Sequence, residues 1–110
     1  MRGEDLYQAA LRLGPLTVNT TVADYVLRAR WQYRPDCVNY QRLEPDEAVA
    51  VPLGEGMVAY EPFWCGLVDG GFDGWVTYEM CSPLRDGNSA AVLDRYARQA
   101  VEQIRGWDAD

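Results

Sequence analysis

The feature that most constrains this chain is a strongly β-prone run over residues 75–80, WVTYEM, which stands between two amphipathic helical segments. The run lacks the polar alternation of a half-exposed strand and carries one charge, Glu79, near its C-terminal end. Buried parallel strands have this pattern. Because helical segments flank the run, the sequence predicts an α/β protein with parallel strands.

The remaining elements follow from periodicity and from residues that end helices. Apolar spacing predicts helices over residues 4–13, 59–68 and 89–106, and β-rich composition predicts a strand over 16–21. Gly70-Gly71 is a stop signal for the second helix, and Phe72 after it suits the apolar contact of a glycine cap. Asn88 or Ser89 can cap the third helix.

The stretch from about residue 29 to 57 is the least regular. It contains Pro35, Pro45 and Pro52, and we expect a long loop with one short helix near residues 45–49. The loop ends at Gly54 and Gly56, where the backbone can turn or approach a ligand closely. Only two strands are then visible, too few to bury the 75–80 run on both faces, so we expect the chain to be a piece of a larger fold.

Composition narrows the functional classes. A chain of 110 residues predicts one domain, and a net charge of −7 disfavours nucleic-acid and anionic-membrane partners. The nearest basic patch, Arg28, Arg30 and Arg34, is interpreted as a solvated loop, with a phosphate site as the alternative. The absence of histidine excludes Ser-His-Asp and Cys-His nucleophiles and every metal site that needs imidazole within these 110 residues.

Cysteine usage and hydropathy indicate a cytoplasmic protein. The three cysteines, Cys37, Cys65 and Cys81, form no Cys-x-x-Cys pair, which predicts reduced structural thiols. We see no apolar run long enough to cross a membrane and no signal peptide in the N-terminal stretch, so cytoplasmic localisation is the default expectation.

Several motifs together resemble the C-terminal end of the sugar phosphate isomerase/epimerase family, in the xylose isomerase-like TIM-barrel superfamily. Residues 51–60, VPLGEGMVAY, resemble the family's P-x-G-x-G loop before a helix. Residues 71–83, GFDGWVTYEMCSP, resemble its G-[FY]-D-G-W turn and its last barrel strand, which ends in Glu. Residues 21–25 look like the end of the preceding strand, and residues 93–97 resemble the start of the closing helix.

The resemblance spans about residues 4–106 and implies a partial (β/α) TIM barrel over residues 1–110. The chain would hold the last helix of unit six and βα units seven and eight, with two parallel strands and three helices. Strand ends at the C-terminal face of such barrels carry the active site. Glu79 and residues 19–24 fall at such ends.

The resemblance also implies a chemistry: proton transfer next to a sugar carbonyl through an enediolate, with a divalent metal such as Mg²⁺ or Mn²⁺. Glu79 falls at the family's final Glu, a metal ligand and acid/base residue; a solvated or Arg-paired Glu is the structural alternative. The family's two histidine positions fall on Asn19 and Thr21, which are not expected to ligate well.

Asp24 keeps its place in the motif, where it has a possible substrate role or caps the following turn. Gly54 and Gly56 match the loop glycines near the substrate. The other metal ligands belong to strands that this chain lacks. The resemblance therefore implies a sugar or sugar-phosphate substrate and activity only with an N-terminal barrel partner chain.

Two other functions are open. The chain could be a non-catalytic α/β fragment that self-associates or docks on a partner, since it exposes strand sides and apolar helix faces. A remnant of a metal-dependent nuclease of the same superfamily is the weaker alternative, because the net charge of −7 and the lack of histidine disfavour it.

Overall fold

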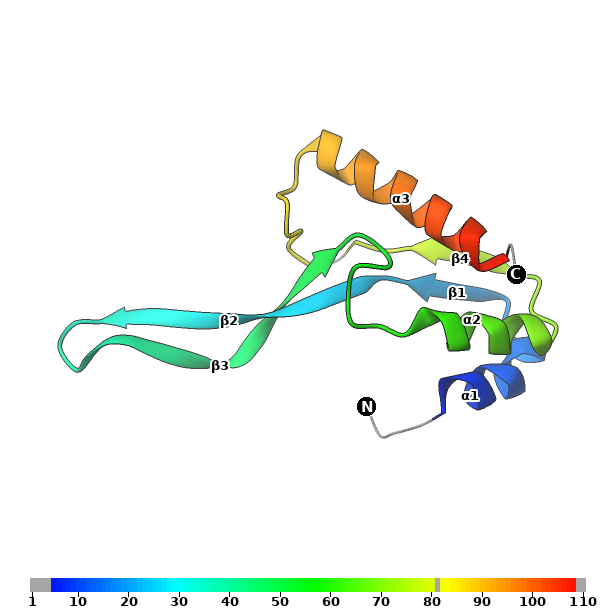
Figure 1. Ribbon diagram of the computed structural model, residues 1–110, viewed down its shortest axis with the longest axis horizontal. Coiled ribbons are helices and arrows are strands. Elements are labelled where there is room, and N and C mark those ends of the chain that lie inside the picture. Colours follow the sequence, from blue (N-terminus) through cyan, green and yellow to red (C-terminus); the bar gives the residue numbers. More distant parts are fainter. Residues whose placement is uncertain (1–4, 81, 109–110) are drawn as a thin grey trace.

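The computed structural model describes residues 5–80 and 82–108, apart from the side chain of Val38. The fold is mixed α/β, with three α-helices and two two-stranded sheets in this part of the chain (Figure 1). In chain order the elements are α1 (Leu6–Leu13), the 3₁₀ turn η1 (Gly14–Leu16), β1 (Asn19–Val22), β2 (Asp24–Arg34), β3 (Val38–Val51), α2 (Tyr60–Asp69), β4 (Trp75–Tyr78) and α3 (Ala90–Asp108).

The predicted parallel pair is confirmed. Strand β4 lies parallel to β1, with Asn19 opposite Trp75 and Val22 opposite Tyr78. The backbone N–H of Glu79 extends the pairing by donating to the carbonyl of Val22 at 3.0 Å. Strand β1 begins at residue 19, later than predicted, because Gly14–Leu16 form a 3₁₀ turn around the proline that ends α1.

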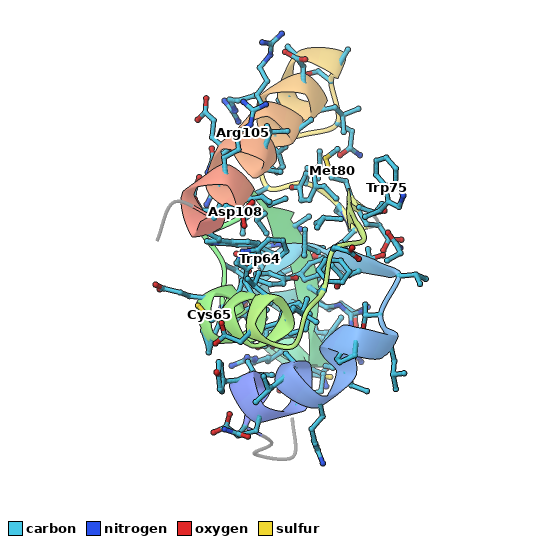
Figure 2. All side chains as sticks on the ribbon, turned by 90° about the vertical axis from the view of Figure 1, so that its right-hand side faces the viewer. Trp64, Cys65, Trp75, Met80, Arg105 and Asp108 are labelled. Carbon is cyan, nitrogen blue, oxygen red and sulfur yellow. The ribbon has the colours of Figure 1, made fainter. Side chains whose placement is uncertain are left out.

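The helices cover this sheet on one face only. Val22 is fully buried and packs with Leu53 of the 52–59 loop and Ala100 of α3. On the other face Trp75 is 81% exposed and projects away from α2 and α3 (Figure 2). The prediction of a strand buried on both faces is therefore wrong for this chain, because α2 and α3 both pack against the side that carries Val76 and Tyr78.

The predicted loop over 29–57 is the largest error. Most of this stretch belongs to a long antiparallel hairpin of β2 and β3, and residues 45–49 are strand, not helix. The prolines that suggested a loop occupy positions that strands tolerate. Pro35 lies in the turn between β2 and β3, and Pro52 follows Val51, the last paired residue of β3. Pro45 lies on β3 between Leu43 and Glu47, opposite the point of β2 where the register shifts.

The hairpin extends away from the helices as an arm (Figure 1). The radius of gyration is 17.5 Å and the long axis measures 59 Å. A compact chain of this length would have a radius of gyration of about 13 Å. The elongation therefore comes from the arm, which is inserted between β1 and the crossover helix α2.

The helix caps follow the sequence closely. The Phe72 N–H donates to the Leu67 carbonyl at 2.9 Å and the Gly71 N–H to the Val68 carbonyl at 3.0 Å, which is a Schellman motif with Gly71 at a φ of +92°. Phe72 packs on the Ala10, Trp64 and Leu67 cluster between α1 and α2, as predicted. At α3 the Ser89 hydroxyl accepts the N–H of residue 92 at 3.3 Å.

Candidate functional site

Glu79 lies directly after β4, exposed, at the C-terminal end of the parallel pair. Because side chains alternate along a strand, Trp75, Thr77 and Glu79 share the uncovered face. On β1 the same face carries Asn19 and Thr21, which the register places opposite Trp75 and Thr77. The structure therefore brings all three predicted positions, 19, 21 and 79, to one face.

This face changes character along the strands. Its N-terminal end carries the large apolar side chain of Trp75, and its middle carries Thr21 and Thr77. The Thr77 hydroxyl donates to Oδ1 of Asn19 at 3.1 Å, which ties the two strands together. The carboxylate of Glu79 stands at the other end, so its chemistry is separated from the apolar end by a polar layer.

Asp24 is placed differently from a ligand-binding side chain. It is 1% exposed, and its carboxylate accepts backbone N–H groups from four residues. Oδ2 accepts from Gly54 at 2.9 Å and from Gly56 at 3.0 Å. Oδ1 accepts from Val58 at 3.2 Å and from Tyr25 at 3.1 Å. Four donors occupy the acceptor sites of the carboxylate, so Asp24 organises the loop that precedes α2.

The two loop glycines serve this arrangement. Gly54 has a φ of +96°, a conformation that disfavours side chains. A Cβ atom at Gly56 would collide with the carboxylate of Asp24. Both glycines therefore let the backbone wrap around Asp24, and the substrate role predicted for all three residues stays a prediction.

The end of β1 is fixed by Tyr60, the first residue of α2. The Ala23 N–H donates to the Tyr60 hydroxyl at 2.8 Å, and that hydroxyl donates in turn to the Ala23 carbonyl. Burial raises the pKa of Tyr60, so the phenol stays protonated and keeps both hydrogen bonds at neutral pH. The strand end next to Glu79 is thus held by α2.

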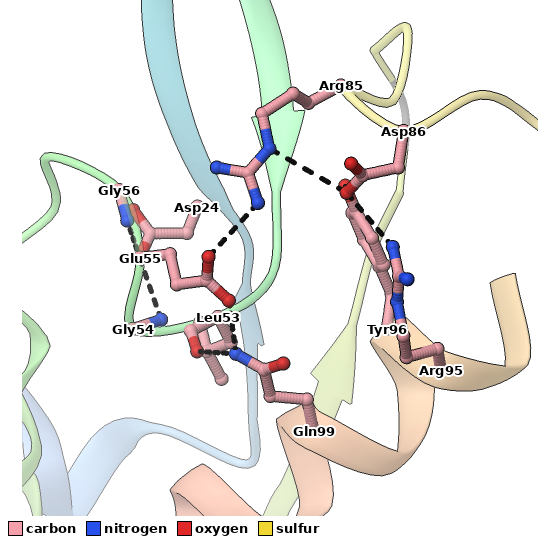
Figure 3. Close-up of polar contacts among 10 residues, drawn as sticks. All are labelled: Asp24, Leu53, Gly54, Glu55, Gly56, Arg85, Asp86, Arg95, Tyr96 and Gln99. Carbon is pink, nitrogen blue, oxygen red and sulfur yellow. Dashed lines mark hydrogen bonds and ion pairs between the residues drawn. The ribbon is translucent and has the colours of Figure 1, made fainter. Parts of the chain in front are cut away.

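A polar network that the sequence analysis missed fixes the same end of the sheet (Figure 3). The buried Tyr96 donates from its hydroxyl to Asp86 at 2.6 Å, and Arg95 pairs with the same carboxylate at 3.0 Å. Arg85 pairs with Glu55 at 3.0 Å, linking the 52–59 loop to the segment before α3. The sequence signal for this network was Tyr96, which lies on the apolar face of α3 and whose hydroxyl needs a hydrogen-bond partner when it is buried.

This network shifts the ionisation of its members. The hydrogen bond from Tyr96, followed by the nearby arginines, lowers the pKa of Asp86. The hydrogen bond from Gln99, which measures 2.7 Å, and then that from Arg85 lower the pKa of Glu55. Burial and then Asp86 raise the pKa of Tyr96. The charges that hold the 52–59 loop to α3 therefore persist at neutral pH.

The side chains that the structure describes do not by themselves form a metal site. Within residues 5–80 and 82–108, no three side chains of the His, Cys, Asp or Glu type gather closely enough to hold an ion. Cys37 and Cys65 are exposed and unbridged, and Cys81 lies outside the described residues. Glu79 alone offers a carboxylate on the uncovered face of β4, so the predicted Mg²⁺ or Mn²⁺ would need ligands from elsewhere.

Comparison with protein-family models, with curated proteins and with solved structures gives no match for this chain. The function is therefore inferred from the arrangement of the chain's own residues. No helix of the described part has the length and apolar character to cross a membrane.

Proposed function

We propose that the chain is the C-terminal part of a metal-dependent sugar or sugar-phosphate isomerase/epimerase, and that it is inactive on its own. In this proposal β1 and β4 are neighbouring strands of a TIM barrel whose other strands come from a partner chain. The uncovered face of the pair, with Asn19, Thr21, Trp75, Thr77 and Glu79, then faces the barrel interior.

The observation that carries the proposal is the order of residues along that face. Barrel interiors are filled by layers of side chains, and active sites lie at the C-terminal ends of the strands. Trp75 suits a filled layer at the N-terminal end, Thr77 a middle layer, and Glu79 a reacting position at the C-terminal end. Helices on the opposite face only are also what a barrel segment requires.

The roles of this chain's residues follow. Glu79 would exchange a proton with the carbon next to the sugar carbonyl, which is general acid–base work suited to a carboxylate. Asp24 and Tyr60 act as positioning residues, because they hold the 52–59 loop and the end of β1 beside Glu79. The metal ligands beyond Glu79 are assigned to the partner, since the described residues of this chain do not gather them.

Isotope exchange tests the proposal. The chain is co-expressed with a segment that carries the first six βα units of a sugar phosphate isomerase barrel, and the complex is incubated with Mn²⁺ and a panel of ketoses and ketose phosphates in D₂O. We expect deuterium at the carbon next to the carbonyl, detected by NMR, from the complex and from neither part alone.

The control separates chemistry from folding. Glu79→Gln should abolish the exchange and leave complex formation intact. Asp73→Asn, which changes an exposed carboxylate at the other end of β4, should leave the exchange unchanged. Exchange that survives Glu79→Gln contradicts the assignment of Glu79. Failure of the complex to form contradicts the barrel assignment.

A second candidate, a non-catalytic association module, is favoured by a separate observation. Leu16, Val18 and Trp75 belong to the segments at the N-terminal end of the parallel pair and are 80%, 79% and 81% exposed. Large apolar side chains left exposed at one end of a sheet are candidates for contact with a partner. A stable complex without isotope exchange on any sugar would favour this function over the isomerase.

A further inference from the structure

The helix layer of this chain extends further than its sheet. Helix α1 packs on α2 through Ala10, which lies against Trp64 and Leu67. Figure 1 shows α1 beyond α2, on the side of β1 away from β4. Close contact fixes this position, because a Cβ atom at Gly66 of α2 would collide with the carbonyl of Tyr7. The part of α1 that extends past β1 is therefore a fixed part of the fold.

An apolar cavity lies between this part of α1 and strand β1. Leu6, Ala9 and Leu13 follow one side of the helix, and Leu13 is 56% exposed. The cavity measures about 280 Å³, and α1, the start of β1 and α2 all contribute to its lining: Leu6, Ala9, Leu13, Thr20, Phe63 and Leu67. An apolar cavity of about 150 Å³ is large enough to hold benzene, so this one can hold a large apolar side chain.

The edge of β1 that points away from β4 has free main-chain groups. The carbonyls of Val18 and Val22 accept N–H groups from the β4 segment at 3.1 and 3.0 Å, so the even-numbered residues of β1 face β4. The N–H and C=O groups of Asn19 and Thr21 face the other edge, where no described residue pairs with them. Edge groups of this kind pair readily with another strand.

The same edge is closed immediately after β1. The hydroxyl of Tyr60 bonds both main-chain groups of Ala23, and the Met57 N–H donates to the Tyr25 carbonyl at 3.0 Å. The 52–59 loop and the start of α2 thus cover the edge from residue 23 to residue 25. The open stretch beside the cavity is confined to β1.

A repeat in the chain indicates the direction of a strand at this edge. Helix α1 is followed after five residues, 14–18, by the four-residue strand β1, and α2 is followed after five residues, 70–74, by the four-residue strand β4. Strand β1 lies beside β4 and parallel to it, and α2 is the crossover between them. A strand in the same relation to α1 would lie beside β1 and parallel to it, at the open edge.

We propose that the open edge of β1 binds one extended strand of a partner chain, parallel to β1, with a large apolar side chain beside Thr20 in the cavity under α1. An extended backbone supplies the alternating donors and acceptors that Asn19 and Thr21 lack, and the cavity selects the side chain. The inference rests on the proposed function for the identity of the partner, the rest of the barrel. It uses neither Glu79 nor a sugar.

Amide hydrogen exchange on the full chain, followed by NMR, tests the open edge. We expect the amides of Asn19 and Thr21 to exchange fast and those of Thr20 and Val22 to exchange slowly, because only the latter pair with β4. Equal protection of all four amides overturns the proposal, since the edge is then already covered. Protection of Asn19 and Thr21 that grows with protein concentration assigns the edge to a second copy and overturns the choice of a partner chain.

A synthetic peptide then supplies the strand. It has about ten residues, with Leu alternating with Thr and Lys at both ends. At about 1 mM, the effective concentration of a tethered segment, it should slow the exchange of Asn19 and Thr21 at least about tenfold and leave Thr20 and Val22 unchanged. No protection by this peptide, or equal protection by a control peptide with Asn in place of Leu, overturns the proposal.

A spin label on the same peptide tests its direction. With a nitroxide at the N-terminus of the peptide, the amide signal of Asn19 should broaden more than that of Ala23, because a parallel strand begins beside the start of β1. Stronger broadening at Ala23 overturns the parallel orientation.

Variants locate the contact on the chain. Thr21→Pro removes an N–H group from the open edge, and Ala9→Phe fills the cavity from the half-buried side of α1. Each should abolish the protection of Asn19 by the peptide and keep the circular dichroism spectrum of the wild type. Gln8→Phe, which adds the same ring at an exposed position of α1, should leave the protection unchanged. Where Thr21→Pro unfolds the chain, Ala9→Phe decides, and protection that survives in it overturns the assignment of the cavity.

Failure of this inference is distinguishable from failure of the proposed function. Strand binding at β1 by a chain whose co-expressed complex exchanges no deuterium into any sugar supports the open edge and rejects the isomerase. Deuterium exchange by a complex in which the amides of Asn19 and Thr21 still exchange fast supports the isomerase and overturns the strand at β1.

Discussion

Substituting Asp24 by asparagine replaces the carboxylate that holds the loop before α2 with an amide of nearly the same shape. Each oxygen of Asp24 accepts two backbone N–H groups, so whichever oxygen becomes an NH₂ group leaves two buried donors without an acceptor. Each buried, unsatisfied donor costs about 1–3 kcal/mol. We therefore expect Asp24→Asn to lower the free energy of unfolding by about 4 kcal/mol.

Thermal unfolding and amide hydrogen exchange both measure this loss of stability. For a chain of 110 residues, a loss of about 4 kcal/mol lowers Tm by about 15 °C. The amides of Gly54, Gly56 and Val58 belong to a loop yet should exchange slowly with solvent in the wild type. In Asp24→Asn their exchange should be at least about tenfold faster.

The control is Asp73→Asn, because Asp73 is exposed and should tolerate the same chemical change with a shift within about 0.5 kcal/mol. The reasoning is refuted if Asp24→Asn melts within about 3 °C of the wild type and the exchange rates of the three loop amides are unchanged. That result would mean that the carboxylate is not the acceptor of these N–H groups in solution.

Four further substitutions test the polar network, the exposed face of the sheet and the cap of α2. Tyr96→Phe should cost about 1–2 kcal/mol in urea unfolding, because Asp86 loses a hydrogen bond within the network. The pKa of Asp86 in the folded state lies below its usual value of 3.8, so the ionised carboxylate stabilises the fold above pH 3.8 and this stabilisation is lost as the pH falls further. Asp86→Asn should therefore make the free energy of unfolding less dependent on pH in this acid range. Trp75→Ser should change stability by less than about 0.5 kcal/mol in the isolated chain, because the side chain is 81% exposed, and a larger loss would show that the side chain is covered in solution. Gly71→Ala should cost about 1 kcal/mol, measured by thermal melting, because a side chain at a φ of +92° is strained; an unchanged Tm would contradict the Schellman geometry.

The parts of the fold that the sequence predicts are those fixed by local signals. The three helices, the Gly70-Gly71 stop and the Ser89 cap depend on neighbouring residues, and the structure confirms them. The parallel pairing was also predictable, because a β-prone run after a helix has few alternatives. These features depend on spacings of a few residues.

The hairpin was missed because its signal is split between two distant segments. Residues 28–34, RARWQYR, alternate polar side chains (Arg28, Arg30, Gln32, Arg34) with apolar or aromatic ones, but the two faces of a ribbon become evident only when residues 38–43 lie opposite. The prolines then dominated the interpretation, and only the pairing shows that they lie in a turn, at a register shift and after the last paired residue. Burial of Val49, Ala50 and Val51 depends on the same distant pairing.

The candidate site shows the same limit. Sequence reasoning placed Glu79 at a strand end and Asn19 and Thr21 on the neighbouring strand, and the structure brings them to one face. It could not show that Asp24 holds a loop 30 residues further along, because the donors are backbone groups without a sequence signature. Nor could it join Tyr96 to Asp86, since either residue alone is ordinary.

The insertion of the arm within the β1–α2 connection bears on the order of folding. Val22 and Tyr60 are 38 residues apart, and joining such distant segments carries a loop-closure cost that grows with chain length. Asp24 pairs with Val51, so a hairpin that forms first reduces the effective loop to about ten residues. Two halvings of loop length lower that cost by about 1.2 kcal/mol. A hairpin that formed first would therefore bring the strand and its crossover helix together before either has a core to join.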